Sequence, residues 1–184
     1  MLDNIIVFRM FDFKERPHER IRAVAGADCK DAFYRPSDPN CIMTMAHTHQ
    51  NVRCDGSLVQ SVPSEVDIYG LLDEIKNNCS GNYGNVNSFT ISQGGTYILS
   101  YVGTNLSTIG YDLDEWTDKY KDNIDKMIKR NKFTVANQEA FFTKFLKYVV
   151  KINGLEVYKK EGNVINKLEY NSTTKTATKT PCPN

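Results

Sequence analysis

The 184-residue chain has no long hydrophobic run, no C-x-x-C cysteine pair and no excess of charge of either sign. Because no stretch approaches ~18 consecutive apolar residues, the sequence predicts no transmembrane helix. The first four residues carry no basic side chain, and the apolar run Ile5–Phe8 is too short for the core of a signal peptide. If the chain is a domain of a larger polypeptide, its targeting signals would lie outside it.

Charge and cysteine usage exclude several classes of protein. There are 23 lysines and arginines against 22 aspartates and glutamates, a formal net charge of +1. Such a balance predicts no basic surface for nucleic acid or for an anionic membrane, so neither is expected as a partner. The five cysteines lack the spacing of zinc ribbons and thioredoxins, and their odd number leaves at least one thiol free or bridged to another molecule.

The hydrophobic pattern predicts an α+β domain over residues 1–170, with a mixed, mostly antiparallel sheet flanked by helices. The predicted elements are a strand Asn4–Phe13, a loop Gly26–Asn40, a strand Ile42–His47, a helix Ser64–Asn78, a hairpin over 88–92 and 96–102, helices from Asp112 and from Val135 to Asn153, and a hairpin over 155–159 and 164–170. Residues 171–184 lack apolar periodicity and are predicted to be a disordered tail.

The three helical segments differ in their patterns. Residues with helical spacing predicted to be buried are Ile68, Leu71, Leu72 and Ile75 in the first helix, Trp116 and Tyr120 in the second, and Phe141, Phe142 and Phe145 in the third. Acidic and basic residues mix most densely between Asp112 and Lys132, which is typical of a solvated helix face. Ser64 and Asp112 are suited to be N-caps.

The chemistry of the chain is concentrated between Ile42 and Leu72. His47 and His49 are two residues apart at the end of a predicted strand, so their side chains are expected on one face of it. Asp67 falls in the first turn of the following helix. Two imidazoles and a carboxylate can bind zinc, and three protein ligands leave a fourth position for water, as in catalytic sites. Zinc lowers the pKa of such a water to ~7, and the Ser64 hydroxyl would donate to a developing oxyanion.

These residues resemble a known signature. His47-Thr48-His49 followed by Ser64-Glu65-Val66-Asp67 is similar to the H-x-H…S-x-x-D motif of the JAB/MPN (JAMM) metalloproteases. The resemblance implies a cytidine-deaminase-like α/β sandwich and a zinc-dependent peptidase or isopeptidase acting on a peptide or protein substrate. By this match His47, His49 and Asp67 would be the zinc ligands, and Ser64 the hydroxyl on the oxyanion side. The later helices and hairpin resemble JAB-like domains of bacterial toxin-associated and mobile-element proteins.

The chain departs from the family pattern in two places. The 14 residues between His49 and Ser64 exceed the usual gap and predict a longer loop. The family also uses an upstream glutamate as general base, and only Glu15 and Glu19 precede His47. Glu19 is the candidate for this role. If neither glutamate serves, the site would bind metal without fast hydrolysis.

Other interpretations of the same residues compete with this one. Ser64-x-x-Asp67 is also a helix capping box, and an isolated H-x-H pair is usually structural. A PHP-type phosphoesterase needs several further histidines, and only His18 remains. A cysteine hydrolase built on Cys54 accounts for fewer of the residues. The main alternative to an enzyme is a JAB-like binding or assembly module with a vestigial metal site.

Overall fold

The computed structural model describes residues 33–34, 43–50, 52, 56–78, 86–104, 106, 110 and 112–182. The predicted strand Asn4–Phe13 and the candidate base Glu19 lie outside these ranges. The strands are β1 (Phe33–Tyr34), β2 (Met43–Thr48), β3 (Val86–Ser92), β4 (Gly95–Tyr101), β5 (Leu155–Glu161), β6 (Val164–Asn171) and β7 (Thr176–Pro181). The helices are α1 (Glu65–Asn78), α2 (Leu113–Lys129) and α3 (Val135–Phe145), and a π-helical turn, Leu146–Val150, continues α3.

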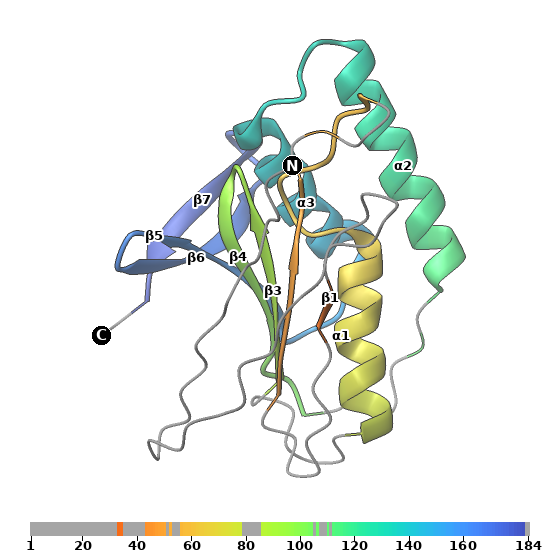
Figure 1. The fold of residues 1–184 in the computed structure, drawn as a ribbon, viewed down its shortest axis with the longest axis vertical. Helices are drawn as coiled ribbons and strands as arrows, with labels where there is room; N and C mark the ends of the chain where they lie inside the picture. The colour runs from red at the N-terminus through yellow and green to blue at the C-terminus, as the bar shows by residue number, and fades with distance from the viewer. Residues whose placement is uncertain are drawn as a thin grey trace, which may run out of the picture.

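Within the described residues the seven strands form one sheet, in which spatial order follows chain order. β2 and β3 are parallel, and the other neighbouring pairs are antiparallel. A parallel pair requires a crossover connection, which α1 supplies. Figure 1 shows α1 alongside this pair, with α2 packed outside it. The prediction of a mixed, mostly antiparallel sheet flanked by helices is confirmed.

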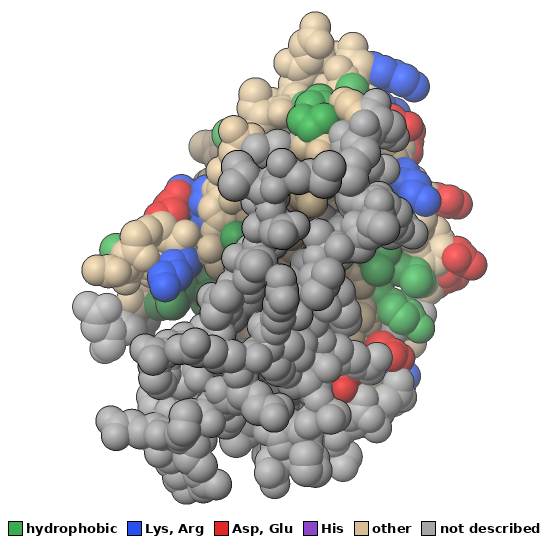
Figure 2. All heavy atoms as spheres, viewed as in Figure 1, with side chains coloured by type: hydrophobic (Ala, Val, Ile, Leu, Met, Phe, Trp, Pro, Cys, Tyr) green, Lys and Arg blue, Asp and Glu red, His purple; other side chains and the backbone are tan. Residues whose placement is uncertain are grey.

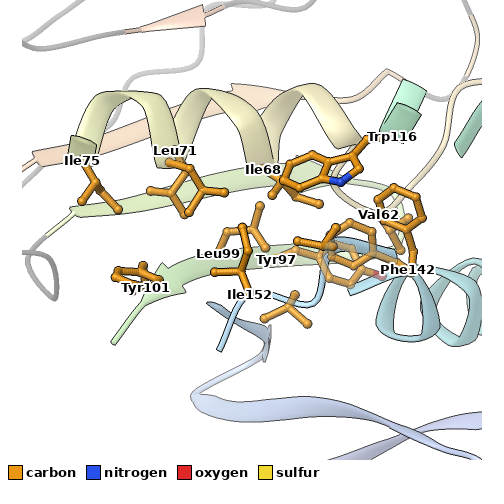
Figure 3. Close-up of a cluster of buried hydrophobic side chains, with 14 of the residues drawn as sticks. Val62, Ile68, Leu71, Ile75, Tyr97, Leu99, Tyr101, Trp116, Phe142 and Ile152 are labelled. Carbon is orange, nitrogen blue, oxygen red and sulfur yellow. The ribbon is translucent and has the colours of Figure 1, made fainter. Parts of the chain in front are cut away.

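One face of the sheet carries the hydrophobic core. The strand register aligns a buried row across five strands: Met45, Ser88, Leu99, Val157 and Leu168. The predicted stripe of α1 packs over this face (Figure 3), and its four members, Ile68, Leu71, Leu72 and Ile75, are fully buried. Burying one such side chain stabilises the folded state by about 1.5–3 kcal/mol, so the stripe supplies much of the free energy that holds α1 on the sheet.

The other helices add aromatic side chains to the same core. Trp116 and Tyr120 of α2 are buried, and the Tyr120 ring meets that of Phe145 edge-on at a centroid distance of 5.3 Å. Asp112 caps α2 as predicted, because its side chain accepts from two backbone N–H groups of the first turn. On the outside of α2, Lys119 pairs with Glu115 one turn away. Figure 2 shows acidic and basic side chains interspersed along this edge, as predicted for a solvated face.

A second row on the core face is polar although it is buried. His47, Thr90, Tyr97, Lys159 and Asn166 follow one another across β2 to β6, and we call them the polar row. Glu139 of α3 supplies a hydrogen-bond acceptor to the central members of the polar row. Its Oε1 accepts from Tyr97 Oη at 2.8 Å and from Lys159 Nζ at 2.6 Å. Burial lowers the pKa of Lys159, but its bonds to Glu139 outweigh burial and raise that pKa above its usual value.

The tail is where the sequence-based prediction fails. Residues 176–181, predicted to be disordered, form β7 and pair with β6 in antiparallel register. The turn before it is built by Asn171, whose Oδ1 accepts from the N–H groups of Thr173 and Thr174. The β-branched threonines of β7 favour extended backbone. Their exposure at the sheet's edge explains the absence of an apolar pattern.

One smaller difference concerns the strand that pairs with β2. Phe33–Tyr34 lies in a segment predicted to be loop, yet it forms β1 and pairs with β2, placing Phe33 opposite His47. In the described part of the chain, no helix is both long and apolar enough to cross a membrane.

Candidate metal centre

His47 and His49 lie on one side of the chain at the end of β2. His49 follows the last residue of the strand, but its backbone N–H still donates to Ile91 O at 2.8 Å, so the chain stays extended beside β3. The two imidazoles therefore project together, with ring centroids 4.8 Å apart. Both are buried, at 5% and 6% exposure. The two side chains therefore lie on one face of the extended chain, as predicted.

Asp67 is held in the first turn of α1 by a capping box. Ser64 N–H donates to Asp67 Oδ2 at 2.6 Å, and Asp67 N–H donates to Ser64 Oγ at 3.3 Å. The capping-box interpretation of Ser64-x-x-Asp67 is therefore correct, and it is compatible with a role of Asp67 in a metal site. Anchoring Oδ2 leaves Asp67 Oδ1 facing His47 Nε2 at 3.1 Å.

His47, His49 and Asp67, here called the ligand cluster, bring their donor atoms to a common point. The two Nε2 atoms are 3.1 Å apart, and His49 Nε2 lies 3.6 Å from Asp67 Oδ2. Ligand atoms around a tetrahedral zinc ion with bonds of ~2.0–2.2 Å lie about 3.3–3.6 Å from one another. The two distances to Asp67 end on different carboxylate oxygens; with one ligand atom taken from each residue, the three atoms lie within 4.8 Å of one another, so a bound ion would draw them closer together. Among the described residues, this is the group of three that could hold a metal ion.

The tautomer of neutral His49 and the ionised state of Asp67 also suit a cation. Gln60 O, a pure acceptor, lies 3.0 Å from His49 Nδ1, so the proton of neutral His49 sits on Nδ1 and its lone pair on Nε2. In the metal-free protein, burial opposes the ionisation of Asp67, but the hydrogen bond with His47 and then the positive charges of the two histidines in their protonated form outweigh it. The pKa of Asp67 is thus held below its ordinary value, and its carboxyl group is in the ligand form.

The loop and helix beside the ligand cluster are tied to the rest of the fold. Tyr120 Oη of α2 donates to Pro63 O at 2.8 Å, directly before the cap of α1. Thr90 of the polar row places Oγ1 3.4 Å from His47 Nε2.

Gln60 was not among the predicted site residues. Its contribution is a backbone carbonyl, which any residue would supply, so no side-chain pattern reveals it.

Of the two residues predicted to be catalytic, the structure describes Ser64 but not Glu19. Ser64 is buried at the N-terminus of α1, where the helix dipole favours negative charge, and it touches the ligand cluster through Asp67. Glu19 lies outside the described residues, so its role as general base stays a prediction.

Comparisons with protein-family models, with curated proteins and with solved structures find no match to this chain. The resemblance to JAB/MPN proteins therefore rests on the motif residues.

Proposed function

We propose that this chain is a zinc-dependent hydrolase of the JAB/MPN metalloprotease type, which cleaves peptide or isopeptide bonds. The observation that carries the proposal is the buried ligand cluster, in which one potential ligand atom from each residue lies within 4.8 Å of the others. Three protein ligands leave a position for water, the arrangement of catalytic zinc sites. The crossover from β2 through α1 to β3, which brings the H-x-H pair to Ser64 and Asp67, supports the motif assignment.

The donor set favours zinc over the hard divalent cations. Mg²⁺ and Ca²⁺ prefer oxygen ligands, whereas imidazole suits zinc and other transition metals. Two histidines with one carboxylate are also the ligands of non-haem ferrous iron. The Ser-x-x-Asp part of the motif supports the zinc assignment, and metal analysis separates the two ions.

Each residue of the site has a stated task in this proposal. His47, His49 and Asp67 hold the ion, which when bound lowers the pKa of water to ~7 and polarises a substrate carbonyl. The Ser64 hydroxyl donates to the oxygen that gains negative charge, at the favourable end of α1. Glu19 takes the proton from the attacking water and passes it to the leaving amine.

Metal content tests the site directly. Purified wild-type protein is expected to contain one zinc ion per chain by elemental analysis, and the His47→Ala/His49→Ala variant none. His18→Ala is the matched control, since it removes the remaining histidine and is expected to keep the metal. Wild type without bound metal after zinc loading would refute the proposal, and stoichiometric iron would reassign the ion.

Catalysis is tested separately on the zinc-loaded protein. We expect peptide or isopeptide cleavage by wild type, and a loss of about 10²–10⁴-fold in Glu19→Gln, the range for general-base catalysis. Wild type that holds zinc but cleaves no member of a peptide and isopeptide library would indicate a binding module with this fold. Unchanged cleavage in Glu19→Gln would remove Glu19 from the mechanism.

A further inference from the structure

We infer that Gln138 of α3, assisted by Ser92, is a positioning residue of the metal centre that acts on His49 through a single peptide group. This inference rests on the proposed metal site. Gln138 lies 77 residues beyond its partner in the loop, and its side chain is outside the motif that identifies the ligands. It is buried at 2% exposure, from which we conclude that its amide is committed to contacts inside the protein.

The connection runs through the peptide between Gln60 and Ser61. The carbonyl of this peptide accepts the His49 Nδ1 proton at 3.0 Å. The N–H of the same peptide, on Ser61, donates to Gln138 Oε1 at 2.6 Å. One rigid, planar group thus has the ligand imidazole at one end and the α3 side chain at the other.

The orientation of the Gln138 amide follows from its two neighbours. Its oxygen faces the Ser61 N–H, which can only donate, and its nitrogen faces Phe133 O, which can only accept, at 3.4 Å. The amide is therefore set in one direction, with its acceptor toward the loop. A side chain of the same length without an acceptor would leave the half-buried Ser61 N–H without this partner.

The next peptide of the loop is fixed from β3. Ser92 Oγ donates to Ser61 O at 2.5 Å and accepts from Gly94 N–H at 3.1 Å. A Cβ on Gly94 would lie 2.9 Å from Ser61 Cβ, closer than such atoms approach. The loop is thus held on both sides, by α3 and by the turn between β3 and β4.

This arrangement has a chemical consequence for the ligand. A peptide whose N–H is hydrogen-bonded is polarised, so its carbonyl becomes a stronger acceptor. A stronger acceptor at Nδ1 holds the His49 tautomer and ring and increases the basicity of Nε2, the atom proposed to bind the ion. Partners of this kind typically change metal affinity by 10–100-fold. Because Gln138 acts through an intervening peptide, we expect the lower end of that range.

The experiment compares three substitutions on α3. Gln138→Met keeps the length of the side chain and removes the acceptor, whereas Gln138→Glu retains an acceptor oxygen. Thr143→Val is the matched control, because Thr143 Oγ1 donates only within α3, to Glu139 O at 2.8 Å and Ala140 O at 3.2 Å. Zn²⁺ affinity is measured by competition with a chromogenic chelator. We expect about tenfold weaker binding in Gln138→Met and wild-type affinity in the other two.

A second readout needs no metal. In the metal-free protein, ¹⁵N spectra should show His49 with a protonated Nδ1 in wild type and Gln138→Glu, and a mixture of tautomers in Gln138→Met. Wild-type Zn²⁺ affinity together with an unchanged His49 spectrum in Gln138→Met would overturn the inference. So would an equal loss of affinity in Thr143→Val, which would indicate general loosening of α3.

The two proposals fail in distinguishable ways. If wild type binds no Zn²⁺, the proposed function is refuted, and the ¹⁵N comparison still decides whether Gln138 sets the His49 tautomer. Should Gln138→Met not fold, Ser92→Ala is measured in the same assays, since it releases the adjoining carbonyl of the loop. Wild-type affinity and an unchanged His49 spectrum in that variant would also overturn the inference.

Discussion

If the proposed zinc site is correct, replacing Asp67 by asparagine is expected to abolish the stabilisation that zinc would give to the fold while leaving α1 capped. Asparagine has the same shape, and its amide oxygen can still accept from Ser64 N–H, which now lies 2.6 Å from Asp67 Oδ2. The substitution removes the negative charge from a cluster in which two imidazole nitrogens lie 3.1 and 3.6 Å from the carboxylate oxygens. A neutral amide is a weak ligand for zinc, so only two ligands of the cluster remain.

The size of the effect follows from linkage between binding and folding. Zinc at about 100 times its dissociation constant, binding the folded protein alone, adds about 2.7 kcal/mol to the free energy of unfolding. For a chain of 150–250 residues, 1 kcal/mol shifts the melting temperature by about 2–4 °C. Wild type is therefore expected to gain about 5–11 °C on zinc addition. Asp67→Asn should gain close to nothing.

The assay is thermal unfolding followed by circular dichroism, with zinc and then with excess chelator. A reducing agent and a low zinc concentration are required, because the five cysteines of the unfolded chain also bind zinc and diminish the shift. His18→Ala serves as the control and should respond as wild type does. Equal zinc-induced shifts in wild type and Asp67→Asn would refute the assignment of Asp67 as a ligand.

Three further predictions concern the surroundings of the site. Lys159→Met should lower the free energy of unfolding by about 3–5 kcal/mol in urea titrations, because it leaves the buried Glu139 charge without its cation. Adding Glu139→Gln should restore part of this loss. If the two substitutions instead change the free energy of unfolding additively, the coupling between these residues is contradicted. Gly94→Ala should weaken zinc binding, since the new Cβ would lie 2.9 Å from Ser61 Cβ and push Ser61 away, and an unaltered zinc affinity would show that the loop tolerates the shift. In the metal-free protein the pKa of Asp67 is lower than in the unfolded chain, so its carboxylate stabilises the fold fully above about pH 4 and less as pH falls through the folded value. The stability difference between wild type and Asp67→Asn should accordingly shrink between pH 5 and pH 3, and a growing difference would reverse the sign of the argument.

Sequence alone predicts those helices and strands that bury only one of their faces, because their hydrophobic residues then recur at a regular spacing. The helical spacing of Ile68, Leu71 and Ile75 identified α1 and its buried side, because α1 packs on one face of the sheet. The ligand cluster was predictable for a related reason. Its members lie within one strand, loop and helix start, where the i, i+2 rule and capping chemistry fix side-chain directions locally.

What sequence could not reveal depends on distant partners. None of the side chains of β7 is buried, so its strand state depends on backbone pairing with β6 and carries no hydrophobic signal. Gln138 gives no signal either, since a buried glutamine on an amphipathic helix resembles any polar interruption until Ser61 is placed beside it. Tertiary context supplied both features.

The spacing of these contacts along the chain has a consequence for how the site would be made. His49 and Gln60 are 11 residues apart, whereas Ser61 and Gln138 are 77 apart. Closing the longer loop costs about 2 kcal/mol more chain entropy. At ~5–20 residues per second, a ribosome needs several seconds to reach α3 after completing the ligands. We therefore expect a nascent chain to present a ligand set for metal before the contact that tightens it exists, so that metal supply during translation would influence how efficiently the protein matures.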